Sequence, residues 1–162
     1  WGGVEMSVCG IGGEGGLGWC GVETVEGGKG ADNNGCGGAG DMVSGGGGNG
    51  GVVGGKGKDV LWGGKGNDVL FGGGGNANGD GLRDTFVFKS AANEGGGFDI
   101  IRDFENNIDK IDMTESGCAS AADVIADAAQ VGANVEIDFD FSGILRLDNF
   151  ALADLNAGDF IF

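Results

Sequence analysis

The chain has 162 residues, of which 41 are Gly and none is Pro, His or Tyr, and its 9 Lys and Arg against 25 Asp and Glu give a formal net charge of −16. The absence of His excludes Ser-His-Asp and Cys-His catalytic groups, a histidine general base and His-ligated zinc. The acidic excess disfavours nucleic acid and anionic membrane surfaces as partners, and it favours a cation that prefers oxygen ligands, such as calcium.

Glycine is concentrated in the first 80 residues, which hold 33 of the 41. Glycine at this frequency without the period of collagen is ordinarily typical of a flexible linker. A nine-residue period argues against a linker, since residues 54–62 read GGKGKDVLW and residues 63–71 read GGKGNDVLF. Less regular copies extend back to residue 9. We therefore divide the chain into a degenerate Gly-rich start at 1–35, a regular array at 36–103 and a C-terminal segment at 104–162.

Each copy follows the pattern GGxGxDxUx, in which U is a large apolar residue. Gly at positions one, two and four permits positive φ and lets backbone carbonyls converge on one point. Asp at position six adds a charged oxygen ligand. The strand at positions seven to nine is too short to be stable alone, so the copies are expected to stack.

This pattern resembles the RTX, or haemolysin-type, calcium-binding nonapeptide repeat. The resemblance implies a mainly β fold, a parallel β-roll (RTX β-helix) in which two copies make one turn and residues 18 apart lie side by side. It also implies several Ca²⁺ ions, each shared by the loops of adjacent turns. The residues expected to hold calcium are Asp32, Asp41, Asp59, Asp68, Asp84 and Asp99, with Gly55, Gly57, Gly64 and Gly66.

The spacing of the acids suggests which of them share an ion. Asp41 and Asp59 are 18 residues apart and form the best-supplied pair. Gly50 stands between Asp32 and Asp68 in the same series, so an ion there would depend more on backbone carbonyls and water.

The repeat frame slips beyond residue 72. Treating the next stretch as a short insertion places Asp84 on the side of Asp68, with Phe86 as the apolar residue of that unit. A last partial unit contributes Asp99. We therefore expect Asp68 and Asp84 to form a second calcium pair.

The C-terminal half resembles the cap that follows such repeats in serralysin-like proteases and related type I secretion substrates. The matching stretches are DTFVF at 84–88, FDIIRDF at 98–104, DKIDM at 109–113 and DFIF at 159–162. The last of these resembles a type I secretion signal, an interpretation compatible with an ordinary closing strand.

One short helix and a β-hairpin are expected within this cap. Ser120 begins a capping box, which predicts a helix that runs to about Val131 and ends near Gly132. Residues 135–141 alternate between apolar and acidic, and Ser142-Gly143 then turns the chain into a second strand. Such a cap would cover the open end of the roll.

Two further residue types leave alternatives open. The four Cys, at 9, 20, 36 and 118, show no CxxC spacing, so disulfides and free, partly buried thiols are both compatible with the sequence, whereas zinc is disfavoured. Trp62 and Phe71, at position nine, are expected on the outer walls of the roll. They would pack against the cap, another chain or an upstream domain.

The sequence thus predicts a secreted, extracellular bacterial module that binds calcium, is exported by a type I secretion apparatus and folds on Ca²⁺ afterwards. One alternative is the non-catalytic C-terminal part of a secreted hydrolase, such as a serralysin-like protease, lipase or polysaccharide-modifying enzyme. Another is a repeat-built adhesin, surface-layer or filament subunit that self-associates. No HExxH or GxSxG motif occurs, so any catalytic domain would lie outside this chain. No apolar run reaches the roughly 18 residues of a membrane span.

Overall fold

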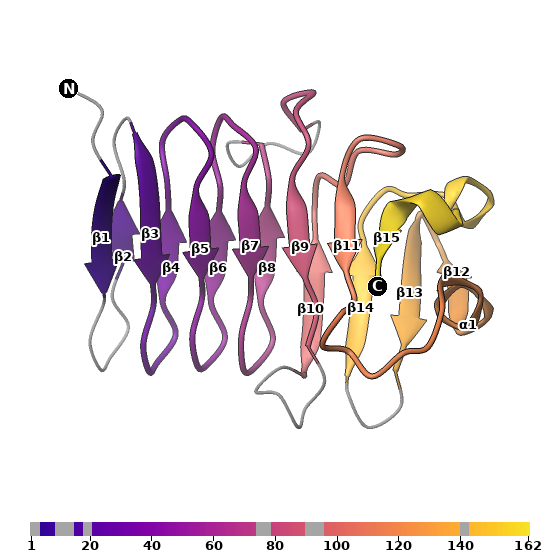
Figure 1. Cartoon of the computed structure of the whole chain (residues 1–162). Coiled ribbons are helices and arrows are strands. Elements are labelled where there is room, and N and C mark those ends of the chain that lie inside the picture. Colours follow the sequence, from indigo (N-terminus) through magenta and orange to yellow (C-terminus); the bar gives the residue numbers. More distant parts are fainter. Residues whose placement is uncertain (1–3, 9–14, 18–20, 74–78, 90–95, 140–142) are drawn as a thin grey trace.

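The computed structural model describes residues 4–8, 15–17, 21–73, 79–89, 96–139 and 143–162. The chain passes alternately through short strands of two facing sheets, and successive turns stack along one axis from the N-terminus to the C-terminal cap (Figure 1). The predicted parallel β-roll with a cap of one short helix and a hairpin is confirmed.

From β1 to β11 successive strands alternate between the two sheets, whereas β12, β13 and β14 all join the second sheet. The first sheet contains, in spatial order, β1 (Val4–Val8), β3 (Val22–Glu26), β5 (Met42–Ser44), β7 (Val60–Trp62), β9 (Thr85–Val87), β11 (Lys110–Asp112) and β15 (Phe160–Ile161). The second sheet contains β2 (Gly15–Leu17), β4 (Asn33–Gly35), β6 (Gly51–Val53), β8 (Val69–Phe71), β10 (Phe98–Ile101), β14 (Ile144–Leu147), β13 (Asn134–Asp138) and β12 (Ala128–Val131). The helices are α1 (Ala121–Ala126), η3 (Leu152–Asp154) and η4 (Ala157–Asp159).

The register of the sheets follows the sequence period. Val43 pairs with Leu61 and Val52 pairs with Leu70, so in each case partners are 18 residues apart. Because side chains alternate along a strand, only the middle residue of each three-residue strand faces inward. Val43, Val52 and Leu61 are at most 1% exposed, which confirms position eight as the core position.

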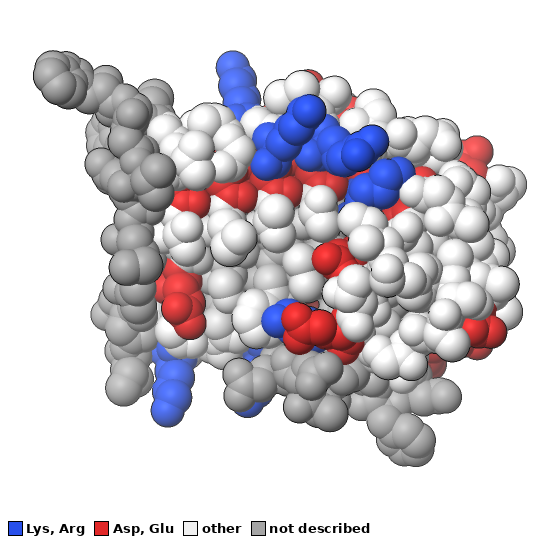
Figure 2. Space-filling model, in the orientation of Figure 1, with Lys and Arg blue, Asp and Glu red and all other residues white. Residues whose placement is uncertain are grey.

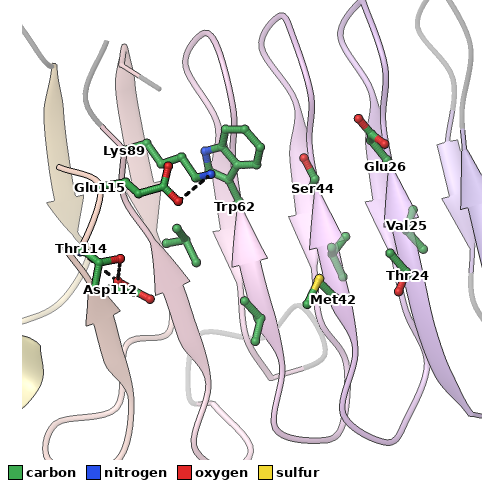
Figure 3. A pocket seen from close by; sticks show the side chains of 13 residues that line it. Thr24, Val25, Glu26, Met42, Ser44, Trp62, Lys89, Asp112, Thr114 and Glu115 are labelled. Carbon is green, nitrogen blue, oxygen red and sulfur yellow. Dashed lines mark hydrogen bonds and ion pairs between the residues drawn. The ribbon is translucent and has the colours of Figure 1, made fainter. Parts of the chain in front are cut away.

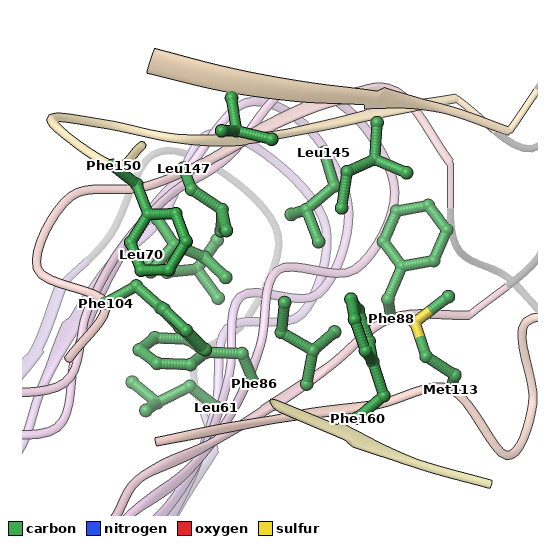
Figure 4. Close-up of a cluster of buried hydrophobic side chains, with 14 of the residues drawn as sticks. Leu61, Leu70, Phe86, Phe88, Phe104, Met113, Leu145, Leu147, Phe150 and Phe160 are labelled. Carbon is green, nitrogen blue, oxygen red and sulfur yellow. The ribbon is translucent and has the colours of Figure 1, made fainter. Parts of the chain in front are cut away.

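Two departures from an apolar core position occur along the stack. Asn34 occupies that position in β4, where it is buried and its amide Nδ2 donates to the carbonyl of Ser44 at 3.1 Å. Toward the cap the interior becomes aromatic: the rings of Phe86 and Phe104 have centroids 6.1 Å apart, and those of Phe104 and Phe150 are 5.4 Å apart (Figure 4). The larger side chains fill the space where the roll meets the hairpin.

The helix prediction was right at its start and wrong at its end. Ser120 is the N-cap and its Oγ accepts from Asp123 N, but α1 ends at Ala126. Residues 128–131 instead form β12, which pairs antiparallel with β13, and Gly132 (φ +64°) turns the chain between them. β14 pairs with one edge of β13, and β12 supplies hydrogen-bond partners to the other edge. This strand pairing outweighs the helix propensity of the alanines. None of the described helices is long and apolar enough to cross a membrane.

The predicted hairpin is present as β13 and β14, which pair antiparallel with Val135 opposite Leu147. β14 then continues the second sheet beside β10, and β15 continues the first sheet beside β11. The strands nearest the C-terminal end of the roll are thereby paired. Ser142 of the expected turn lies outside the described residues.

Candidate metal sites

The loops that join the strands lie along two edges of the roll and carry the repeat acids. We call the edge that contains loops 36–41, 54–59, 72–84 and 102–109 the Asp59 edge, and the edge that contains loops 27–32, 45–50, 63–68 and 88–97 the Asp68 edge. Gly55, Gly57, Gly64 and Gly66 all have positive φ, as the repeat pattern predicted. At Gly66 (φ +119°) a Cβ would lie 2.5 Å from the carbonyl oxygen of Gly48 in the preceding turn. Only glycine allows the turns to approach so closely.

A column of acids runs along the Asp59 edge. The amide of Asp41 donates to Oδ1 of Asp59 at 2.7 Å, and the amide of Asp59 donates to Oδ1 of Asp84 at 2.8 Å. The same bond joins Glu23 to Asp41 at 2.8 Å and Asp84 to Asp109 at 2.9 Å. One carboxylate oxygen of each Asp therefore holds the preceding turn, and Asp41 and Asp59 lie together as predicted.

The Asp68 edge has a second column with a gap at Gly50. The amide of Gly50 donates to Oδ1 of Asp68 at 2.6 Å, and the amide of Asp68 donates to Oδ1 of Asp99 at 3.0 Å. The acid beside Asp68 is therefore Asp99. Pairing Asp84 with Asp68 was wrong, because β9, the next described strand after β8, lies in the first sheet, and Asp84 just before it accepts from the amide of Asp59.

The second carboxylate oxygen of three repeat aspartates is buried and has no hydrogen-bond partner among the described residues. These atoms are Oδ2 of Asp41, Asp59 and Asp68. No described Lys or Arg forms an ion pair with these carboxylates. A Cβ on Gly63 would lie 2.8 Å from Oδ2 of Asp68, so glycine keeps the space beside that oxygen open.

Burial raises the pKa of six acids in the two columns, which are Asp41, Asp59, Asp68, Asp84, Asp99 and Asp109. Repulsion from neighbouring carboxylates adds to this at Asp59, Asp84, Asp99 and Asp109. Burial is the largest cause at Asp84, whose pKa rises to about 8 with further contributions from Asp109 and Asp59. Burial also raises the pKa of Asp99 to about 7 and of Asp59 to about 6. The raised pKa values mean that keeping these grouped carboxylates ionised costs free energy, which a bound cation would offset. Acidic side chains form a row along the length of the roll in Figure 2.

Sequence reasoning missed two buried acids of the Asp59 edge. Asp109 closes the column, and its Oδ2 accepts from the amide of Glu105 at 2.9 Å. Asp109-Lys110-Ile111 repeats the spacing of Asp and apolar residue in the regular copies, a signal that was available. Asp103 accepts from the amides of Gly72 and Gly73, both at 2.9 Å, so both of its oxygens hold the long loop in place.

A match to known repeats covers the most regular part of the roll. Residues 44–77 match the family model of the RTX calcium-binding nonapeptide repeat (4 copies). The chain therefore carries RTX calcium-binding repeats. Their buried carboxylates and glycine-bounded spaces fit Ca²⁺, which takes six to eight oxygen ligands in flexible geometry. Asp59 and Asp68 lie inside the matched segment, and Asp32, Asp41, Asp84 and Asp99 lie outside it. No curated protein matches the chain.

The outer face of the first sheet carries a shallow groove that contains Trp62 (Figure 3). The Nζ of Lys89 lies 4.2 Å from the centroid of the Trp62 ring, and it also forms an ion pair with Glu115 at 3.2 Å. Phe71 lines a depression on the second sheet. Both aromatics lie on outer walls, as position nine predicted.

Proposed function

We propose that the chain is a calcium-dependent β-roll module of a secreted bacterial protein, which leaves the cell unfolded through a type I secretion apparatus and folds when it meets extracellular calcium. The observation that carries the proposal is the set of buried carboxylate oxygens in Asp41, Asp59 and Asp68 that have no hydrogen-bond partner within the described parts of the chain. In this proposal the chain binds and folds and performs no catalysis.

Binding and folding are linked because the ligands of each ion come from two turns. Asp59 lies beside Asp41, and Asp68 lies beside Asp99, only when the turns are stacked. Calcium therefore binds the folded chain and not the unfolded one, and it stabilises the fold by mass action. At low calcium the net charge of −16 and the entropy of a glycine-rich backbone both favour the extended chain.

The C-terminal residues support the export part of the proposal. Phe160 is buried beside Ile111, whereas Ile161 and Phe162 are 38% and 47% exposed. Asp159 is buried, and its Oδ2 accepts from the amide of Asn156 at 2.9 Å. The segment 159–162 thus closes the first sheet in the folded protein and is free to act as a signal before folding.

A calcium titration tests the folding claim. Far-ultraviolet circular dichroism of the chain, started in excess chelator, should show a cooperative gain of β signal as calcium rises. Magnesium at the same concentration should be a poor substitute, because it requires a smaller octahedral site. A roll that is equally β-rich in chelator and in saturating calcium would refute the proposal.

Export is tested separately in cells that express a type I secretion apparatus. Removal of residues 159–162 should lower the amount of protein in the medium and raise the amount retained in the cells. Equal export of both forms would contradict the signal assignment and leave the calcium assignment standing.

A further inference from the structure

One loop of the Asp59 edge carries a side chain where its neighbours have none. Position one is Gly54 in the adjacent loop 54–59 of this edge and Gly63 in loop 63–68 of the Asp68 edge, but it is Cys36 in loop 36–41. A Cβ on Gly54 would collide with Oδ2 of Asp59, and one on Gly63 would lie 2.8 Å from Oδ2 of Asp68. A side chain at position one is thus directed at the open oxygen of the acid at position six.

Cys36 lies in a cluster with two buried carboxylates. The Sγ of Cys36 and one carboxylate oxygen each of Glu23 and Asp41 all lie within 4.8 Å of one another. Glu23 is 4% exposed and Asp41 is 3% exposed. Oδ1 of Asp41 accepts from the amide of Glu23 at 2.8 Å, and Oδ2 is buried with no hydrogen-bond partner in the described part of the chain.

The charge around the sulfur favours a cation. Cys36 is a free thiol that lies beside the buried carboxylates of Glu23 and Asp41. The negative charge of these two carboxylates attracts a divalent ion. Calcium binds oxygen and has little affinity for sulfur, whereas zinc and cadmium accept both ligand types.

We propose that Glu23, Cys36 and Asp41 form a mixed sulfur and oxygen site for a thiophilic divalent cation of the zinc and cadmium class. The ion takes a lone pair of Sγ and displaces the thiol proton to solvent, with no change of oxidation state. This site takes the open oxygen of Asp41 that the proposed calcium pair would otherwise use, so at loop 36–41 the thiophilic ion competes with calcium, whereas loops 54–59 and 63–68 hold calcium. The site requires a folded roll but does not depend on how the chain is exported.

A cadmium titration of the full chain tests this site, because a cadmium–thiolate bond has an ultraviolet charge-transfer band. The titration is made in saturating calcium with a phosphine reductant, so that the roll is folded and the thiols are reduced. The wild-type chain should develop the band. Excess zinc should remove the band by displacing cadmium, and further calcium should leave it unchanged. Absence of the band would overturn the proposal.

Variants assign the band to the cluster. Cys36→Gly, which restores the residue of the neighbouring loops, and Cys36→Ser should each lower cadmium affinity at least about tenfold. Asp41→Asn should do the same. Cys118→Ser is the matched control, since Cys118 is also a half-buried free thiol, and its affinity should be unchanged. Circular dichroism in calcium verifies folding. Wild-type affinity in both Cys36 variants would refute the assignment.

Discussion

Replacement of Asp59 by Asn separates the two effects of a buried repeat carboxylate. Asn has nearly the same shape and keeps an Oδ1 that can accept the amide of Asp41, a bond of 2.7 Å in the structure. The substitution removes the negative charge and with it the charged calcium ligand. It should therefore have opposite consequences in chelator and in calcium.

The magnitude in chelator follows from the pKa of Asp59, which is raised from 3.8 to about 6, first by burial and then by Asp41 and Asp80. A shift of about two units corresponds to about 3 kcal/mol of destabilisation by the charged form at pH 8. Water near the loop screens part of this, so we expect Asp59→Asn to stabilise the metal-free roll by about 1–2 kcal/mol.

In calcium, Asp59→Asn should change the stability in the opposite direction. The loss of one charged ligand should weaken calcium binding at least about tenfold, since even the loss of a residue that only orients a metal ligand weakens metal binding about 10–100-fold. A tenfold loss equals about 1.4 kcal/mol. The calcium midpoint of folding should rise accordingly.

Urea unfolding measures the effect in saturating calcium, and folding induced by a stabilising osmolyte in chelator measures the effect on the metal-free roll. Glu26→Gln is the control, because it removes one negative charge from an exposed position of β3. It should change either value by no more than about 0.5 kcal/mol. If Asp59→Asn destabilises the chain in chelator, or leaves the calcium midpoint unchanged, the assignment of Asp59 is wrong.

Three further predictions concern pH and two loop positions. In the metal-free roll the pKa of Asp84 (about 8) lies above its ordinary 3.8, so the folded chain binds more protons than the unfolded one. In chelator with a stabilising osmolyte, thermal unfolding should therefore show stability falling as pH rises from about 4 to 8. In saturating calcium, where protons compete with the ion, the slope should reverse, and equal slopes would contradict the sites. Ala39 has φ +95° at position four, so Ala39→Gly should raise the free energy of unfolding by about 0.5–1 kcal/mol, and a loss would show that the strain is absent. Gly63→Ala should lower the free energy of unfolding in calcium by about 1–3 kcal/mol, because its Cβ would meet Asp68. Gly47→Ala, whose Cβ would have its nearest contact at 3.6 Å, should lower it by less than about 0.5 kcal/mol. Equal losses in the two variants would refute the steric argument.

The fold was readable from the sequence wherever the period was regular. The position of Leu61 in the core and the contact of Asp41 with Asp59 both follow from a nine-residue repeat that alternates between two sheets. The partner of Asp84 did not follow, because a long loop changes the spacing without changing the number of strands. Counting strands, not residues, would have placed Asp84 beside Asp59.

The candidate thiol site was hidden for a different reason. The sequence shows Cys36 thirteen residues from Glu23 and five from Asp41, a spacing that matches no metal motif. Only the stacking of turns brings the loop of Cys36 against Glu23. Cys9 and Cys20, which the sequence left without assigned partners, lie outside the described residues.

The side chains inside the roll indicate that ion binding contributes more to the stability of the turns near β3 than to that of the turns near the cap. Inward side chains of the first sheet grow from Val25 and Val43 to Leu61 and then Phe86, and each added methylene contributes about 0.8 kcal/mol on burial. Turns near the cap are therefore held by apolar contact as well as by calcium. Turns farther from the cap bury less, and one of them buries Asn34 in place of an apolar residue. In a stack whose units contact only their neighbours, order should spread from the cap toward β3, with ion binding stabilising each added turn.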